Sequence, residues 1–180
     1  RAFEEAAELV AEILNARPDE VVFTSGGTES NNLALFGLAV DELQGPGRLA
    51  SSPIEHPAVG EVGAHLEARG FVADFAPVDR EGAVDVDAMA ALFYERTRLA
   101  TLMLANNEVG TIQDVARLAD LAAARGVPVH TDAVQAVGRI PVDFAALGVA
   151  TLAASGHKFH GPAGSGVLLV RRGVRLAPRL

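Results

Sequence analysis

The segment 149–170 reads VATLAASGHKFHGPAGSGVLLV and carries the only lysine of the chain, Lys158. It begins with the apolar run 149–153 and ends with the apolar run 167–170, and both runs predict buried strands. Lys158 therefore lies in a glycine-rich connection between two strands. A buried lysine has a lowered pKa and readily forms a Schiff base, whereas a lysine in a solvated loop does not. This segment alone leaves both interpretations open.

The composition favours helices packed on a sheet. The 180 residues suit a single domain, which buries roughly 70 % of the surface of its unfolded chain. Apolar residues make up 49 % of the chain and aromatic residues 5 %, so small aliphatic side chains must fill the core. Cysteine is absent, which excludes disulfides, thiolate metal sites and a cysteine nucleophile within these residues.

Net charge and hydropathy indicate which classes of binding partner and which compartment to expect. The net charge is −8 and there is no basic run, so we expect neither a nucleic-acid partner nor an anionic membrane partner. No apolar stretch approaches the length that spans a bilayer, and the first residues lack the pattern of a signal peptide. We therefore expect a cytoplasmic protein.

Helical periodicity alternates with short apolar runs along the chain. The pattern predicts helices over 2–15, 28–36, 57–70, 85–93 and 114–126, and further strands over 21–24, 49–52, 71–76, 99–104 and 127–130. Strands that alternate with helices predict a three-layer α/β/α fold with a mostly parallel sheet. In such folds, ligands bind beyond the carboxyl ends of the strands. The polar residues expected at that edge are Gly26, Gly27, Thr28, His56, Asn107, Asp132, Gln135, Ser155, His157 and Lys158.

Each of these groups has a functional and a purely structural interpretation. The turn 25–28, SGGT, offers backbone N–H groups and a helix N-terminus to one phosphate, or is simply a turn between strand and helix. Asp132 could pair with a cationic ring nitrogen or cap a helix. His56 could stack on an aromatic ligand or cap the helix that begins at Pro57. Asn107 and Gln135 could bind a ring substituent or satisfy backbone groups of their own loops.

A metal site is disfavoured. The histidines near Lys158, together with His56, His130 and Asp132, do not have the spacing of a known short metal-binding motif, and no thiolate is present. A Schiff-base lysine, an acid for a ring nitrogen, a phosphate cup and a stacking group are instead the components of a pyridoxal phosphate site.

Five motifs in order resemble those of the cysteine desulfurases, the NifS/IscS-type members of the class V aminotransferase group. They are FTSGGTESNN (23–32), EHPAV (55–59), NNEVGTIQ (106–113), HTDAVQAVG (130–138) and SGHKFHGP (155–162). The resemblance covers nearly the whole chain. It implies the large domain of a fold-type I enzyme whose cofactor is pyridoxal 5'-phosphate.

The resemblance also implies a role for each residue. Lys158 would hold the cofactor through a Schiff base. Its phosphate would be bound by Gly27, Thr28, Ser155 and His157, with Gly156 between the last two. Asp132 would keep the pyridine nitrogen protonated, and Gln135 would bond the ring oxygen. Asn107 would contact the ring or its oxygen, and His56 would stack on the ring and relay protons.

The implied reaction is the removal of sulfur from L-cysteine to give alanine and a protein persulfide, as in iron–sulfur cluster assembly. Lys158 would remove the Cα proton, and a protein cysteine would attack the substrate sulfur. A homodimer and a sulfur-acceptor protein are the implied partners. Related enzymes, such as a selenocysteine lyase, and a catalytically incomplete cofactor-binding domain remain alternatives, although Glu55-His56 and 106–108 favour the desulfurases.

The sequence departs from the family pattern in two ways. We expect residues 1–180 to be an incomplete large domain, with the N-terminal arm, the C-terminal small domain, the nucleophilic cysteine and a phosphate ligand from a neighbouring subunit all lying outside them. The family also often has a basic residue at the position of Ala163.

Overall fold

Seven strands form one sheet in the order β1-β7-β6-β5-β4-β2-β3, in a computed structural model that describes residues 1–39 and 45–177. The strands are β1 (Val21–Thr24), β2 (Arg48–Ser51), β3 (Val72–Phe75), β4 (Thr97–Thr101), β5 (Val129–Asp132), β6 (Thr151–Ser155) and β7 (Gly166–Val170). β2 to β6 are parallel to their neighbours in this set, and β7 is antiparallel to both β6 and β1. The stretch between β6 and β7 is too short for a crossover helix, so the chain turns straight back.

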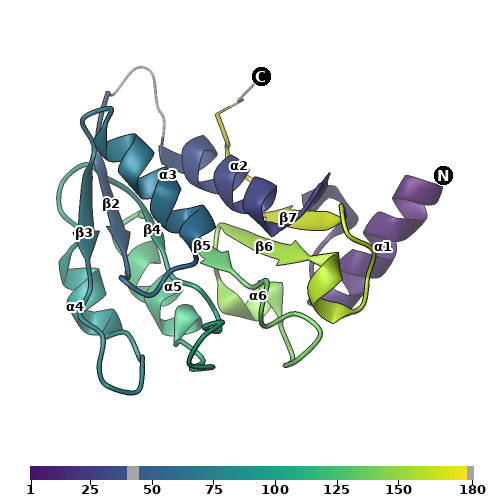
Figure 1. Cartoon of the computed structure of the whole chain (residues 1–180). Coiled ribbons are helices and arrows are strands. Elements are labelled where there is room, and N and C mark those ends of the chain that lie inside the picture. The colour runs from purple at the N-terminus through teal and green to yellow at the C-terminus, as the bar shows by residue number, and fades with distance from the viewer. Residues whose placement is uncertain (40–44, 178–180) are drawn as a thin grey trace.

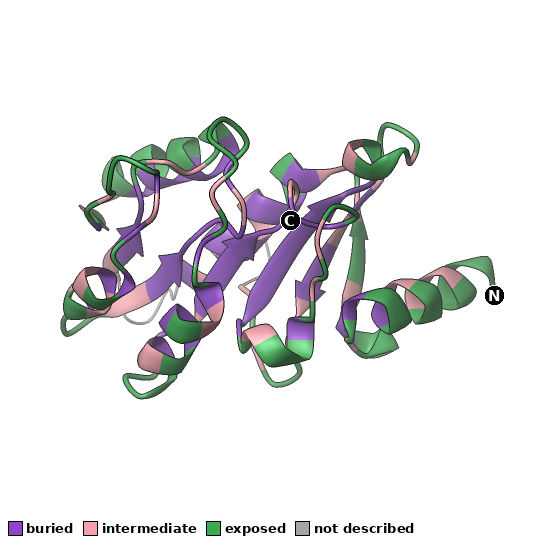
Figure 2. Ribbon diagram, turned by 90° about the horizontal axis from the view of Figure 1, so that it is seen from below, coloured by how far each residue is buried: buried purple, intermediate pink, exposed green. Residues whose placement is uncertain are grey.

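Helices cover both faces of the sheet (Figure 1). The helices α2 (Gly27–Ala39) and α3 (Pro57–Glu67) lie on one face, and their apolar side chains pack on β2 and β4 around Leu35, Leu66 and Leu99. A second cluster fills the other face, under α1 (Ala2–Leu14), α4 (Val86–Ala91), α5 (Val115–Ala123) and α6 (Phe144–Leu147). The sheet is the buried middle layer, and exposed residues concentrate on the outer sides of the helices and in the loops (Figure 2). The three-layer fold with a mostly parallel sheet is confirmed.

Most predicted boundaries hold to within two residues, and the ends of α2, α3, α5 and β4 differ by three. Smaller differences change the position of site residues. β5 extends to Asp132 and β6 to Ser155, so these two residues are the last of their strands rather than parts of the following loops. α2 begins at Gly27, one residue before the predicted start. β4 ends at Thr101 instead of Leu104, although Leu102 and Leu104 still donate backbone hydrogen bonds to β5.

The apolar residues of α1 do not all turn inward. Ala11 and Leu14 are buried, whereas Phe3, Leu9 and Ile13 are largely exposed. Phe3 meets the ring of Phe23 edge to face at 5.4 Å between centroids. The helical periodicity therefore predicted the helix correctly, but not the burial of its apolar side.

The carboxyl ends of five strands meet at one edge of the sheet. β1 runs in the same direction as β6, because both are antiparallel to β7, and β2, β4 and β5 share that direction through the parallel ladder. The loops after these strands carry the residues singled out in the sequence. No helix among the described residues has the length and apolar character needed to cross a membrane.

Candidate active site

A cavity of about 170 Å³ lies at this edge of the sheet. Its walls come from the loops that follow β1, β2, β4, β5 and β6. The residues that line it are Gly27, Thr28, Asn31, His56, Met103, Asn107, Asp132, Val134, Gln135, Ser155, His157 and Lys158. Of the ten residues to which the resemblance assigns a role, nine line the cavity and Gly156 does not. Gly26, expected at the same edge, does not line it either. Gly156 is buried behind Ser155, and a side chain at this position would collide with Ser165.

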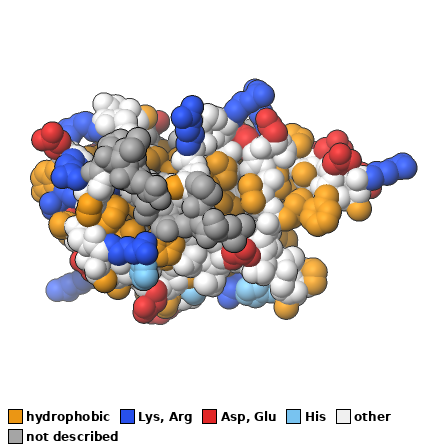
Figure 3. Space-filling view, turned by 90° about the horizontal axis from the view of Figure 1, so that it is seen from above, with side chains coloured by type: hydrophobic (Ala, Val, Ile, Leu, Met, Phe, Trp, Pro, Cys, Tyr) orange, Lys and Arg blue, Asp and Glu red, His pale blue; other side chains and the backbone are white. Residues whose placement is uncertain are grey.

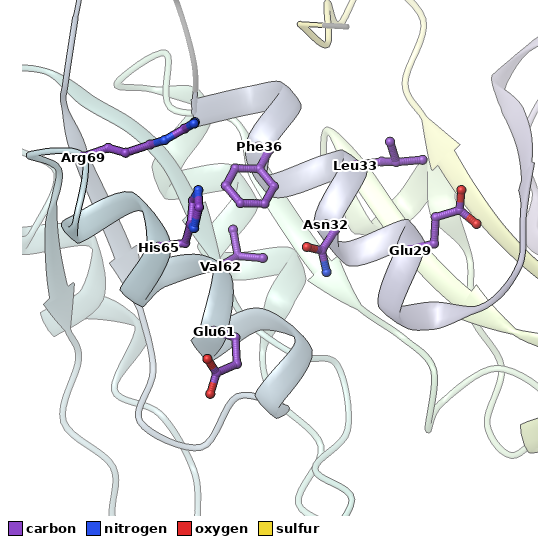
Figure 4. A pocket seen from close by; sticks show the side chains of 8 residues that line it. All are labelled: Glu29, Asn32, Leu33, Phe36, Glu61, Val62, His65 and Arg69. Atoms are coloured by element: carbon purple, nitrogen blue, oxygen red, sulfur yellow. The ribbon is translucent and has the colours of Figure 1, made fainter. Parts of the chain in front are cut away.

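A larger hollow of about 570 Å³ lies between α2 and α3. Figure 4 shows Phe36 and His65 facing each other across it, with ring centroids 5.3 Å apart in an edge-to-face arrangement. Glu29 and Glu61 also line it, but Lys158 and Asp132 do not. We place the candidate site in the smaller cavity, because the groups able to do covalent and acid–base chemistry converge there.

One end of the cavity is built to receive an anion. The backbone N–H groups at the start of α2 have no partner within the helix, and the helix dipole favours a negative charge there. Ser155 approaches this turn from β6, and its Oγ lies 2.9 Å from Nδ1 of His157. A Cβ added to Gly27 would come within 2.5 Å of Val134, so glycine keeps this end open.

Asp132 provides a buried carboxyl group that can pair with a cation at another part of the cavity wall. Its carboxyl is buried at the end of β5, with the residue 4 % exposed. Oδ1 accepts a hydrogen bond from the backbone N–H of Val134 at 2.9 Å, and Oδ2 accepts one from Nδ2 of Asn31 at 2.7 Å. Burial raises the pKa of Asp132, and these two hydrogen bonds, with the charges of His56 and Lys158, oppose that rise. Asp132 is thus neither a surface aspartate nor a helix cap.

His56 takes the capping role, and its ring also lines the cavity. It is the N-cap of α3, where its Nδ1 accepts a hydrogen bond from the backbone N–H of Ala58 at 3.0 Å. Since Nδ1 carries the lone pair that accepts this bond, the neutral ring holds its proton on Nε2. In the neutral ring, Nε2 is therefore the nitrogen that can donate a proton.

Lys158 lies in a short 3-10 helix, Gly156–Phe159, directly after β6. The residue is partly exposed, so it is neither fully buried nor in an open solvated loop. The turn places it at the wall of the cavity rather than within the sheet, because the chain must leave β6 and return as β7. Its side chain lines the same cavity as Asp132 and the start of α2.

Glu55, next to His56, is a half-buried residue with a buried carboxyl oxygen, and the motif analysis did not assign it to the site. Its Oε1 accepts hydrogen bonds from Oγ of Ser52 at 2.9 Å and from the backbone N–H of Met103 at 2.8 Å. Oε2 is buried and has no hydrogen-bond partner in the structure. Burial raises the pKa of Glu55 to about 7, and the nearby charge of Asp132 raises it further against the two hydrogen bonds.

Three residues of the cavity wall were missed by the motif analysis: Asn31, Met103 and Val134. Asn31 had a detectable signal, because it lies one helical turn after Gly27 and so on the same side of α2. Met103 and Val134 had none. Asn107 and Gln135 line the wall as predicted, and neighbouring Asn106 satisfies the loop backbone by accepting bonds from Glu108 and Val109.

The residues present fit pyridoxal phosphate. The cradle at Gly27, which a Cβ would fill, and the hydroxyl of Ser155 suit a phosphate group. The buried carboxyl of Asp132 suits a protonated ring nitrogen, and Lys158 is an amine on the same cavity. Among the described residues there is no group of three or more His, Cys, Asp or Glu side chains that could hold a metal ion.

Comparison with known proteins defines the class. A sequence model of the family described as "Aminotransferase class-V" matches residues 1–179. The chain therefore belongs to the class-V aminotransferase family, whose members are generally dependent on pyridoxal phosphate.

Within that family, the relatives are cysteine desulfurases. The cysteine desulfurase IscS of Dictyoglomus turgidum is 45 % identical over 177 residues, which cover 98 % of this chain and 45 % of that protein. A solved structure titled "SspA in complex with cysteine" has a TM-score of 0.95 and 36 % identity, over 99 % of this chain and 52 % of that one. A structure of a NifS-like protein has a TM-score of 0.94 and 39 % identity, over 99 % and 49 % of the two chains.

The resemblance seen in the motifs is confirmed by these matches. The chain spans about half the length of the curated relatives that it matches. What those longer proteins do as a whole is therefore a matter of proposal for this chain.

Proposed function

We propose that this chain binds pyridoxal 5'-phosphate and forms the cofactor-binding large domain of a cysteine desulfurase that acts on L-cysteine. The observation that carries the proposal is one cavity lined by the only lysine of the chain, a buried aspartate and the N-terminus of α2. The likeness to IscS proteins and to a structure in complex with cysteine supports the substrate.

The cavity divides the binding task among its walls. Gly27, Thr28, Ser155 and His157 would hold the phosphate, with Gly156 allowing the tight turn behind them. Asp132, held by two hydrogen bonds, would bind the protonated ring nitrogen. Gln135 and Asn107 would contact the ring oxygen, and His56 would lie against the ring.

The chemistry requires a group that accepts electrons from the substrate. Pyridoxal phosphate, when bound, supplies an aldehyde that condenses with amines and a ring that withdraws electrons from the Cα of the substrate. Nζ of Lys158 would anchor the cofactor and, once displaced by the substrate amine, would accept the Cα proton. The Nε2 proton of His56 would be available to a substrate atom, because Nδ1 of this ring is engaged by Ala58. A carboxylate at Asp132 favours the protonated ring that this chemistry needs.

The remaining steps need residues that the 180-residue sequence lacks. A cysteine thiolate is the proposed nucleophile for the substrate sulfur, and the sequence contains no cysteine. We propose that a C-terminal small domain supplies it, and that the functional protein is a homodimer that passes sulfur to an acceptor protein. The coverage of about half of each relative supports this division.

Chemical trapping on lysine tests the proposal. Purified protein incubated with pyridoxal phosphate should develop a visible absorbance band, and borohydride reduction should fix the label on Lys158, read by peptide mass spectrometry. Because Lys158 is the only lysine in the sequence, no other lysine can compete for the label. Lys158→Arg, which keeps the charge, should remove both the band and the label. Folded wild-type protein without label on Lys158 would overturn the proposal.

A further inference from the structure

A row of buried polar side chains connects Asp132 to the interior of the sheet. Oδ2 of Asp132 is 2.7 Å from Nδ2 of Asn31, and Oδ1 of Asn31 is 2.9 Å from Nε2 of His130. Nδ1 of His130 is 2.8 Å from Oγ1 of Thr151. The exposed fractions of Asn31, His130 and Thr151 are 1 %, 0 % and 0 %. The row spans α2, β5 and β6, and only its Asn31 and Asp132 reach the cavity.

The positions of the protons in this row follow from its chemistry. An ionised carboxylate can only accept hydrogen bonds, so Asn31 turns its NH₂ group to Asp132 and its oxygen to His130. His130 must then carry its proton on Nε2. Burial lowers the pKa of His130 to about 3, so the ring is neutral and its Nδ1 is an acceptor for the hydroxyl of Thr151. Every donor in the row then points toward Asp132.

The hydrogen bonds of the row could also run in the opposite direction, away from Asp132, and Asp132 would then be protonated. If Asp132 held a proton on Oδ2, the amide of Asn31 would have to turn over, and His130 would carry its proton on Nδ1. The tautomer of His130 therefore distinguishes an Asp132 whose Oδ2 accepts a hydrogen bond from Asn31 from one whose Oδ2 carries a proton and donates it. The groups that face Asp132 favour the charged form: the backbone N–H of Val134, and His56 and Lys158 across the cavity. Burial opposes the charged form and raises the pKa of Asp132, and the nearby carboxyl of Glu55 opposes it too when ionised.

We propose that Asn31 and His130 are positioning residues, which orient the carboxylate of Asp132 and hold it in the ionised form through a one-way row of hydrogen bonds from Thr151. This inference rests on the proposed function, since an ionised Asp132 is what a protonated ring nitrogen requires. It adds Asn31 at the wall of the cavity and His130 and Thr151 behind it. A merely structural role would fill the space between α2 and the sheet but would not fix the tautomer of His130.

The tautomer can be read directly, without cofactor. Protein labelled with ¹⁵N in histidine is expected to show His130 as the Nε2–H tautomer, with no titration between pH 5 and 8. The sequence has five histidines, so loss of one signal in His130→Gln assigns the resonance. A proton on Nδ1, or titration of His130 within that pH range, would overturn the inference.

Two matched variants on α2 test whether the row of hydrogen bonds affects the binding of pyridoxal phosphate. Asn31→Ala removes the donor to Asp132, and we expect it to weaken pyridoxal phosphate binding by about 10- to 100-fold and to shift the pH dependence of the bound cofactor's absorbance. Asn32→Ala is the control, because its amide only bonds back to the carbonyl of Thr28, and it should stay within about twofold of wild type. Thr151→Ser, which keeps the hydroxyl, should preserve the wild-type tautomer, and Thr151→Val should not preserve the hydrogen bond to Nδ1.

Different results would overturn the positioning role of Asn31 and the proposed function. Wild-type affinity and wild-type pH dependence in folded Asn31→Ala protein would overturn the positioning role while leaving cofactor binding intact. Absence of cofactor binding in the wild type would overturn the proposed function, and the tautomer of His130 in the cofactor-free protein would still decide whether the row is directed as argued.

Discussion

Glu55→Gln is expected to stabilise the protein relative to wild type more at pH 8 than at pH 5. The Glu55 carboxyl is held by Ser52 and by the backbone of Met103 through Oε1, while the buried Oε2 has no hydrogen-bond partner in the structure. Burial raises its pKa from an ordinary 4.5 to about 7. Glutamine keeps an oxygen for the two hydrogen bonds and carries no charge at any pH.

The sign and size follow from proton linkage. Below pH 4.5 the carboxyl is protonated in the folded and unfolded states, and its burial has the least cost. As the pH rises toward 7, the unfolded state ionises first, so folding must take up a proton and the free energy of unfolding falls. With a pKa of about 7 in the folded state and 4.5 in the unfolded state, the loss is about 3 kcal/mol at about 1.4 kcal/mol per pH unit. Above pH 7 no further loss is expected.

The assay is urea unfolding of both proteins at several pH values from 5 to 8, followed by far-UV circular dichroism. The measured quantity is the difference in free energy of unfolding between Glu55→Gln and wild type at each pH, so that the titration of other groups largely cancels. This difference should change in favour of the variant by about 2.5 kcal/mol between pH 5 and 8, because part of the effect already lies below pH 5. Glu61→Gln, at an exposed position on α3, controls for the loss of a negative charge. A difference for Glu55→Gln that is constant from pH 5 to 8 would refute the reasoning.

Three further predictions concern the loops of the site. A Cβ at Gly166 would lie 2.5 Å from the backbone Cα of Gly26, so Gly166→Ala should lower the free energy of unfolding by about 2 kcal/mol or more. A Cβ at Gly60, an exposed position on α3, would meet nothing within 4 Å, so Gly60→Ala should raise the free energy of unfolding by up to about 1 kcal/mol. Urea unfolding measures both changes. Asp132→Asn protein should still be labelled by pyridoxal phosphate and borohydride. It should exchange the Cα proton of L-alanine in D₂O about 100-fold more slowly than wild type, because a neutral amide no longer holds the ring nitrogen protonated. Exchange at the wild-type rate would contradict this role. The 180-residue chain should release no sulfide from L-cysteine beyond that of free cofactor, since it has no cysteine thiol, and faster methylene-blue-detected release with a reductant present would show that a protein thiol is unnecessary.

The distribution of charge on the surface concerns the partners of the protein. Figure 3 shows basic and acidic side chains interspersed over the face seen from above. The absence of a nucleic-acid partner, expected from the net charge of −8, stays a prediction. The homodimer, the sulfur acceptor and the cytoplasmic location stay predictions.

The sequence by itself determined the fold class and the edge of the sheet at which the site lies. Periodicity distinguishes helices from strands, and alternation of the two leaves a mostly parallel sheet as the arrangement that buries both faces. Since parallel strands end at one edge, residues as distant as Gly27 and Lys158 could be assigned to one site before any contact was known. The motifs added the chemistry, because a lysine, an aspartate and a glycine-rich turn in this order resemble one family.

Only the tertiary structure decided which polar groups depend on one another. Nothing in the local pattern shows that Asn31 bonds Asp132 or that His130 lies behind it, because these bonds join residues about 100 positions apart across α2 and β5. The orphaned oxygen of Glu55 is likewise a consequence of packing between the loops after β2 and β4. Local sequence sets backbone conformation through short-range sterics and periodicity, but burial and hydrogen-bond partners depend on the register of elements that meet only in the folded chain. The partly exposed position of Lys158 and the outward-facing apolar residues of α1 are further results of that register, and the sequence pattern did not decide either of them.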